Sequence, residues 1–417
     1  MATLAAGNAR DYKIIGLISF GHLLSHFYFL VLPPILPLMK AEFDVSYAAL
    51  GLIMTAYGLA AGIAQTPIGF LIDHIGGRPS LVVGMAIQGG TIALMGFATE
   101  FWQLLLFYSI SGLANTVYHP ADYAILSASI PKEKLGRAFS IHLFSGNFGW
   151  ALTPGIMVGL TLLWDWRTAF IIVGLVGIVH AVIVGCQGRL LDDDIKARRT
   201  RIADRQRETE KTGITGQGSD GSMSGVRLLF TLPILMGFLF FATMTLGFTG
   251  LRGFFVAAID LLYATPLETA NLALTGFLLG SALGILAGGV LADSWGPRVD
   301  TAFITLLIAA GLVILMGMTK LPLIILIAVF SMSGFLQGIL LPTRDLLIRS
   351  VTPEGSMGKV MGFLSSATML SSAAVPPLFG WLLDIADPNW VFWLSAVFIM
   401  GALFSFVTAK GTSRAVS

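Results

Sequence analysis

The chain has 417 residues, of which 55% are hydrophobic and 12% are charged, and its formal net charge is +2. This composition excludes a soluble globular protein, because soluble domains carry about twice that share of charged residues. The small positive charge is spread over short loops and indicates no nucleic-acid partner, and the single cysteine, Cys186, excludes an internal disulfide. The sequence therefore predicts an integral membrane protein.

Twelve apolar segments are long enough to cross a bilayer, since a hydrocarbon core of about 30 Å needs about 20 apolar residues per helix. They are residues 13–36, 48–72, 80–98, 101–130, 138–163 and 168–188, then 228–255, 268–292, 299–318, 321–350, 359–385 and 389–409. We predict an all-α membrane protein with 12 transmembrane helices in two six-helix bundles, related by pseudo-two-fold symmetry.

A charged stretch, residues 189–225, separates the two apolar halves. It holds eight Lys/Arg and seven Asp/Glu in 37 residues, without an apolar run. Such a segment cannot bury enough surface to offset the entropy lost on ordering. We predict a solvated cytoplasmic linker between an N-terminal bundle, residues 1–188, and a C-terminal bundle, residues 226–417.

The distribution of positive charge predicts the orientation in the membrane. An even number of spans places both termini on one side, and 20 of the 25 Lys and Arg lie on the side of the termini and linker. By the positive-inside rule that side is cytoplasmic. We expect a multi-pass protein of the bacterial inner membrane.

The two halves repeat one another in specific residues. In the loop after the second span, Gly69, Leu71, Asp73, Gly76 and Arg78 recur 220 positions later as Gly289, Leu291, Asp293, Gly296 and Arg298. Further on, Pro120, Pro131, Gly136 and Pro154 recur 222 positions later as Pro342, Pro353, Gly358 and Pro376. Each loop has glycines for a tight turn, a carboxylate to cap a neighbouring helix end and a base at the headgroups. Parallel repeats of six spans are typical of secondary transporters.

With these loops, the sequence resembles the major facilitator superfamily over nearly its whole length. The resemblance implies a secondary transporter whose two bundles rock around a central site lined by spans 1, 4, 7 and 10. It implies that the repeated loop is a conformational latch and not the substrate site. Only Arg78 or Arg298 stands where the family often has several basic residues.

A closer resemblance lies in the N-terminal half. The runs 21–26 (Gly-His-Leu-Leu-Ser-His), 117–120 (Val-Tyr-His-Pro) and 146–154 (Gly-Asn-Phe-Gly-Trp-Ala-Leu-Thr-Pro) are similar to the fosmidomycin-resistance type of efflux transporter. That group commonly has an acidic residue at the position of His26 and a Glu at that of Ala121. The antiporter pattern in span five is present only in part, because Gly149 and Pro154 match it and other positions do not. The drug specificity of the group is therefore not carried over.

Polar side chains within spans are costly unless they face water or a partner, so each is a functional candidate. The candidates for substrate binding or proton coupling are His22, His26, Asn115, His119, Asn147, Arg252 and Gln337, and the candidates for a gate are Asp122, Arg344 and Asp345. His142 and His180 are expected to be structural, and His74 to lie in a loop.

His22 lies near the middle of the first span, and His26 follows one turn later on the same face. A neutral imidazole there could bind substrate or take up a proton, because its pKa is near 6.5. The alternative is a pair of histidines that hold neighbouring helices together. We predict no metal, because no cysteine or carboxylate completes the pair.

His119 and Pro120 lie within the fourth span, where proline removes a backbone hydrogen bond and kinks the helix. Asn115 and Asp122 lie about one turn to either side. This pattern favours a face toward the central site over a purely structural kink.

Arg252 lies between Gly250-Leu251 and Gly253, toward the outer end of the seventh span. It could extend to the outer headgroups. It could instead point into the central site and bind a carboxylate, phosphonate or sulfonate with both arms of its guanidinium.

The 222-residue offset that pairs Pro120 with Pro342 also pairs Asp122 with Arg344. Opposite charges would thus lie at the same depth on related helices, and we predict a cytoplasmic gate between them. The alternative is that Arg344 pairs with Asp345 or with headgroups.

These features favour a proton-coupled secondary transporter of a small, anionic organic solute or drug, with efflux by antiport ahead of uptake by symport. A membrane sensor that has lost transport is an alternative of another class. No nucleotide-binding loop or hydrolase constellation is present, so we predict neither an enzyme nor a cofactor. Besides the substrate, protons and the bilayer, no partner is expected, and the protein should be monomeric.

Overall fold

The computed structural model describes residues 2–191, 228–295, 299–351 and 357–413, and this part of the chain contains helices and no strand. Of the predicted linker only residues 189–191 are described, within the short helix α9 (Gly188–Leu191). The other linker residues, 192–225, lie outside the described residues.

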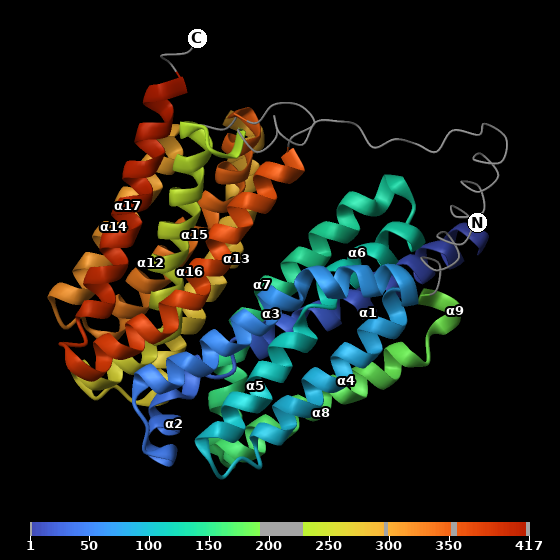
Figure 1. The fold of residues 1–417 in the computed structure, drawn as a ribbon, viewed down its shortest axis with the longest axis horizontal. Helices are drawn as coiled ribbons and strands as arrows, with labels where there is room; N and C mark the ends of the chain where they lie inside the picture. The colour runs from blue at the N-terminus through green and yellow to red at the C-terminus, as the bar shows by residue number, and fades with distance from the viewer. Residues whose placement is uncertain (1, 192–227, 296–298, 352–356, 414–417) are drawn as a thin grey trace.

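The N-terminal half forms one bundle. Its long helices are α1 (Ala2–Phe29), α3 (Tyr47–Ile75), α4 (Gly77–Met95), α5 (Phe101–Asn115), α6 (Tyr118–Ser129), α7 (Lys132–Leu163) and α8 (Trp166–Gly185). Within it α1 packs on α7, α3 on α5, and α4 on α8 (Figure 1). Taken together, α5 and α6 form the fourth of six spans.

The C-terminal half forms a second bundle of six helices. They are α12 (Leu232–Tyr263), α13 (Leu267–Trp295), α14 (Val299–Met318), α15 (Leu323–Val351), α16 (Met357–Ile385) and α17 (Trp390–Ser413). The strongest pairings are α13 with α15 and α12 with α17. The two halves thus have the predicted number of spans.

The first span differs from its prediction over 13–36. It begins earlier and ends at Phe29, and the chain continues through a short 3₁₀ helix, η1 (Pro33–Ile35), into α2 (Leu36–Phe43). Pro33 and Pro34 explain the early end, because a proline removes a backbone donor and restricts the residue before it.

The fourth span, predicted as one helix over 101–130, is divided in two. Helix α5 ends at Asn115 with 3₁₀-type bonds, from Thr116 N–H to Leu113 and from Val117 N–H to Ala114, and α6 begins at Tyr118. Pro120 accounts for the break, because it cannot donate the next helical bond. The repeat-related Pro342 lies inside the continuous helix α15.

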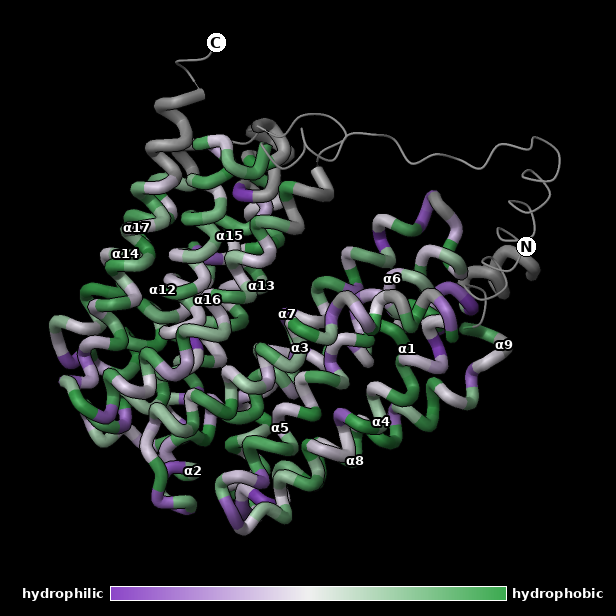
Figure 2. Tube along the Cα trace, in the orientation of Figure 1, coloured by the Kyte–Doolittle hydropathy of each residue, from purple (hydrophilic) through white to green (hydrophobic). Residues whose placement is uncertain are grey.

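Seven helices in the described residues are long and apolar enough to cross a membrane by themselves. Two others, α14 and α17, contain shorter apolar stretches, Ala302–Met318 and Trp390–Ser405. Figure 2 shows hydrophobic residues along most of the helices of both bundles, with hydrophilic stretches at several helix ends. On α8 large apolar side chains such as Leu175, Val179 and Val182 are exposed, which suits contact with lipid.

The two bundles meet through two helix pairs, α3 with α16 and α7 with α13. The start of α1 and the end of α17 lie on one side, here called the terminal side, and the bundles diverge toward it (Figure 1). They approach closely on the opposite, far side. There the backbone of Gly51 on α3 passes against Pro376 and Pro377 on α16, and a side chain at Gly51 would collide with them.

A carboxylate links the bundles at this far side. Asp384, near the end of α16, accepts hydrogen bonds from the backbone N–H groups of Tyr47 (2.9 Å) and Ala48 (2.8 Å), at the start of α3. Lys40 lies 3.7 Å from the same carboxylate. One bundle therefore caps a helix of the other, where the helix dipole favours a negative charge.

Candidate functional site

Four histidines gather inside the N-terminal bundle. His22 and His26 lie one turn apart on α1, and their Nε2 atoms are 3.0 Å apart. His119, at the start of α6, has its ring 5.0 Å from that of His22, and His142 on α7 has its ring 3.8 Å from it. Three helices thus bring their imidazoles to one point, with His22 at the centre.

Asp122 lies beside this group, one turn after His119 on α6. Its carboxylate is 3.8 Å from Nε2 of His142, and both side chains are fully buried. Neither oxygen of Asp122 and neither ring nitrogen of His142 has a hydrogen-bond partner among the described residues. Buried polar atoms are normally hydrogen-bonded, so these four atoms are exceptional within the described part of the chain.

Gly146 on α7 makes room for the cluster. A Cβ at this position would lie 2.9 Å from Cε1 of His26 and 3.0 Å from Nε2 of His22. Both distances are shorter than van der Waals contact allows, so an alanine at position 146 would displace the imidazoles. This gives a physical reason for the first glycine of the run 146–154.

The cluster is connected to the other bundle through Trp150. The indole of Trp150 lies against His26, with ring centroids 4.4 Å apart and ring planes tilted by 38°. The guanidinium of Arg252, from α12, lies 4.6 Å from the centroid of the same indole. Arg252 is also 6.0 Å from the ring of Phe29. Of the two predicted positions for Arg252, this is the one between the bundles.

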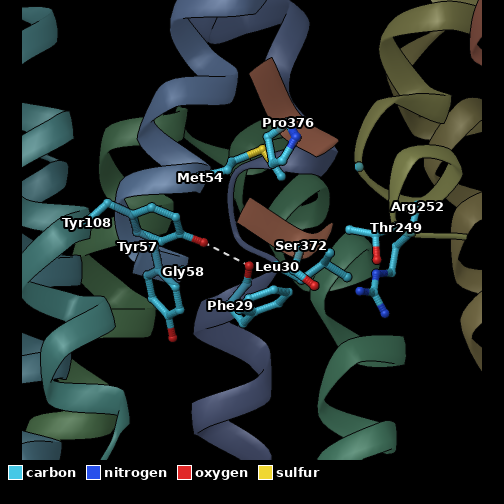
Figure 3. Close-up of a pocket in the computed structure, with 11 residues that line it drawn as sticks. Phe29, Leu30, Met54, Tyr57, Gly58, Tyr108, Thr249, Arg252, Ser372 and Pro376 are labelled. Atoms are coloured by element: carbon cyan, nitrogen blue, oxygen red, sulfur yellow. Dashed lines mark hydrogen bonds between the residues drawn. The ribbon is translucent and has the colours of Figure 1, made fainter. Parts of the chain in front are cut away.

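Arg252 borders a small cavity of about 30 Å³ between the two bundles, which is room for about two water molecules. Figure 3 shows Arg252, Thr249 and Ser372 on one side of it and Tyr57 on the other. Among the described residues no ion pair involves Arg252. In the described part of the chain, the charge of Arg252 is in contact with the aromatic rings of Trp150 and Phe29.

The remaining binding candidates take different positions. Asn115 donates to the backbone oxygen of Ser25 on α1 at 3.3 Å, next to the histidines. Asn147 donates to the carbonyl of Leu143 in its own helix at 3.0 Å, which is a structural role. Gln337, on α15, is half-buried in the C-terminal bundle. Only Asn115 of these three contacts the region of the cluster.

The predicted gate residues do not meet in this conformation. Asp122 is buried inside the N-terminal bundle, whereas the guanidinium of Arg344 lies 4.1 Å from the ring centroid of Phe241, in the C-terminal bundle. The side chain of Asp345 lies outside the described residues. The bundles are apart on the terminal side, so the gate between Asp122 and Arg344 remains a prediction for the other conformation.

The repeated loops are described in part. Gly76 has a φ of 96°, which requires glycine, and it ends α3. Arg78 donates to the carbonyl of Gly185, at the end of α8, over 2.8 Å. Gly69 and Gly289 lie within α3 and α13. The remaining motif positions, the side chains of Asp73 and Asp293 together with Gly296 and Arg298, lie outside the described part.

Sequence reasoning missed two members of the site. His142 was expected to be structural, although His142, Gly146 and Trp150 follow one another at helical spacing and so share one face of α7. Trp150 belongs to the run 146–154, like Gly146. The four-residue spacing indicates that His142 and Trp150 lie on the same face of α7 as Gly146.

Two bundles of six membrane-spanning helices, with polar side chains on the facing helices α1, α7 and α12, define a secondary-transporter fold. The chain belongs to the major facilitator superfamily, which residues 18–267 and 252–416 both match. The predicted family and twelve-helix fold are thereby confirmed. The chain is thus a multi-pass membrane protein of a family whose members are transporters and not enzymes.

Individual relatives are more distant. The chain is 29% identical over 144 residues to the fosmidomycin resistance protein of Escherichia coli, covering 34% of this chain and 35% of that protein. It is 28% identical over 144 residues to the probable L-galactonate transporter of Escherichia coli, covering 34% and 32%. The chain thus spans about a third of the length of these curated relatives.

A solved structure shows the same fold over nearly the whole chain. It is a bacterial homologue of the human lysosomal transporter Spinster, in an inward-facing and occupied conformation. The TM-score is 0.75, the sequence identity is 15%, and the match covers 97% of both chains. At this identity the likeness concerns the fold alone.

Proposed function

We propose that the protein is a proton-coupled secondary transporter of a small organic anion, which works by alternating access and exports its substrate in exchange for protons. The observation that carries this proposal is the position of Arg252. It is a guanidinium between the two bundles, 4.6 Å from the ring centroid of Trp150, with no ion-pair partner among the described residues. A cation held in this way favours an anionic ligand, which its planar N–H edge can bind in bidentate fashion.

Proton coupling is supported by the neighbouring histidines. Trp150 contacts both Arg252 and His26, and His26 contacts His22. Binding of an anion at Arg252 can therefore move the indole against the imidazoles. Imidazole is the side chain that changes charge near neutral pH, so a proton on His22 or His26 is the counterpart to the anion in this mechanism.

Of the two relatives, only one has a name that indicates an organic anion as substrate. One is a resistance protein and the other a probable sugar-acid transporter. The first supports efflux and the second supports an anionic substrate. The direction of transport therefore needs its own test.

We further propose that the terminal side faces the cytoplasm of a bacterial cell, in the inner membrane, where the Lys and Arg of the loops gather. The divergence of the bundles on that side then corresponds to an inward-facing conformation. The bundles 1–188 and 226–417 would move as two bodies, joined by the linker, with the loops around Gly76 and Gly296 acting as latches. A monomer is sufficient for this mechanism.

Proteoliposomes with an imposed pH gradient test the proposal. Radiolabelled sugar acids and other organic anions are added outside, and their uptake is measured with an acid or an alkaline lumen. Antiport predicts uptake into vesicles with an acid lumen, which a protonophore abolishes. Symport, the alternative for an importer, predicts uptake when the outside is acid. Flux that ignores both the gradient and the protonophore would overturn proton coupling, and no flux of any anion would favour a sensor.

A further inference from the structure

We propose that His22, Asp122 and His142 form a binding site for one divalent transition-metal ion, for which Zn²⁺ is the probe. This inference goes beyond the proposed function. It shares His22 with the proposed proton site and Asp122 with the predicted gate, but ion binding is measured without an organic anion and without proton transport. The sequence suggested no metal because the pair His22 and His26 lacked a further ligand. Folding supplies that ligand from α6 and α7.

The donor atoms are close enough to share an ion. One donor atom each from His22, Asp122 and His142 lies within 4.8 Å of the others. Zinc holds nitrogen and oxygen ligands at about 2.0–2.2 Å in a tetrahedron, so neighbouring ligands lie about 3.3 Å apart. The distance between Nε2 of His142 and the Asp122 carboxylate is 3.8 Å. Small side-chain rotations therefore complete the geometry.

The unpaired atoms at this place favour the binding of a cation. Both oxygens of Asp122, both ring nitrogens of His142 and Nδ1 of His22 are buried without a hydrogen-bond partner among the described residues. Protonation of Asp122 would neutralise the carboxylate and would let its O–H donate to Nε2 of His142, but it would leave Nδ1 of His22 unpaired. One divalent ion neutralises the carboxylate and occupies a nitrogen of each histidine, so it satisfies all three side chains at once.

A second triad, His22, His26 and His119, also has its donors within 4.8 Å. In this triad the two α1 histidines already contact each other at 3.0 Å, and His119 is exposed. It contains no carboxylate to offset the charge of the ion. We therefore assign the ion to the buried triad and place His26 and His119 on the side from which the ion enters.

The ligand set also selects the kind of ion. Two imidazoles and one carboxylate suit Zn²⁺, Co²⁺ or Ni²⁺, whereas Mg²⁺ and Ca²⁺ require a shell of oxygen ligands. Three protein ligands leave a fourth tetrahedral position open, as in zinc sites that exchange their fourth ligand. His26, one turn from His22, contacts it with the two Nε2 atoms 3.0 Å apart.

The experiment measures Zn²⁺ binding to the purified full chain by calorimetry and Co²⁺ binding by its visible absorption. The protein carries an affinity tag without histidine and is first treated with a chelator. One saturable ion per chain is expected, with the intense visible bands of tetrahedral Co²⁺. Affinity should fall with decreasing pH, because protons compete for the imidazoles. No saturable binding near one ion per chain would overturn the proposal.

Variants locate the site. Asp122→Asn and His142→Gln should each weaken Zn²⁺ binding at least about 100-fold, since they remove a direct ligand, whereas His119→Gln should weaken it less than either. The matched control is His180→Gln on α8, whose imidazole pairs with the backbone oxygen of Leu17 at 3.0 Å and belongs to neither triad. Unchanged affinity in Asp122→Asn and His142→Gln, or equal loss in the control, would refute the site.

Thermal unfolding separates lost binding from misfolding. Zn²⁺ should raise the melting temperature of the parent and of His180→Gln, because it binds the folded state, and should leave that of Asp122→Asn unchanged. An equal rise in all three proteins would contradict the assignment. Anion transport is not measured here, so the absence of transport would not contradict Zn²⁺ binding. Likewise, the absence of Zn²⁺ binding would not contradict anion transport.

Discussion

At the scale of single residues, the structure concentrates its unusual contacts on Arg252 and the histidines. A guanidinium over an indole is stabilised by roughly 0.5 to 2 kcal/mol, depending on how far it is desolvated. Such a contact leaves the N–H groups that point away from the indole able to donate hydrogen bonds. Arg252 can therefore keep its contact with Trp150 while it binds an anion.

Replacing Arg252 with lysine should impair transport of an organic anion. An ammonium keeps the charge but cannot provide the planar fork or stack on Trp150 in the same way. We expect KM for the anion to rise about tenfold, which corresponds to about 1.4 kcal/mol of lost binding. Initial rates in proteoliposomes measure this. If the lysine variant transports the anion as well as the parent, Arg252 does not bind the substrate.

Replacing His22 with alanine should abolish coupled transport while the protein remains folded. His22 is buried and has its ring against three other imidazoles, so its loss removes the centre of the cluster. The folded state is checked by size-exclusion chromatography in detergent. His180→Ala on α8 is the matched control. Transport that persists in His22→Ala with an unchanged pH profile would show that His22 is neither a substrate site nor a proton site.

At the scale of helices, the far-side closure depends on a cap that crosses between bundles. Asp384 on α16 accepts two backbone N–H groups at the start of α3, and such N-caps contribute about 1 kcal/mol. In a protein that alternates between two states, this amount favours the far-closed state about fivefold. The cap is made between halves, so it is lost whenever the far side opens.

Asp384→Ala should therefore shift the population toward the far-open state about fivefold. The change is measured as the labelling rate of a Met54→Cys variant, at the border of the cavity, in a background where the natural Cys186 is replaced by serine. Asp387→Ala is the control, because that carboxylate accepts a hydrogen bond from the backbone N–H of Asn389 in its own loop. Equal labelling in both variants and in the parent would show that the cap does not hold the far side closed.

At the scale of the whole molecule, rocking of the bundles would close the terminal side while the far side opens. Asp122 and Arg344 lie on related helices, α6 and α15, and face different partners in this conformation. We predict that they pair when the terminal side closes. Loss of one partner from a desolvated ion pair costs about 3 to 5 kcal/mol, which shifts a conformational equilibrium more than a hundredfold.

The gate is tested by the accessibility, from the terminal side, of an engineered cysteine at this level. Asp122→Asn and Arg344→Gln should each favour the form that is open on the terminal side, and the charge-swapped double mutant should restore closure. If the single mutants, the swap and the parent are labelled equally, Asp122 and Arg344 do not form a gate. The swap is the decisive variant, because it restores the pair without restoring either original side chain.

The amino-acid sequence predicts twelve spans in two bundles, because each membrane span must carry its own run of apolar residues and the two halves repeat the same loop. It also identified most of the polar side chains in the spans, since these are rare in lipid. The breaks after Phe29 and Asn115 were not located, although the prolines nearby indicated them. A proline in the sequence thus indicates that a helix is interrupted, but it does not indicate the residue at which the helix ends.

Contacts between polar side chains of different helices depend on tertiary packing and are not predicted by the sequence. His22, His119 and His142 are far apart in sequence, and only the packing of α1, α6 and α7 around Gly146 brings their rings together. The same holds for Arg252 with Trp150 and for Asp384 with the start of α3, which join opposite bundles. Periodicity describes the faces of one helix, whereas contacts between helices depend on how several such faces pack against one another.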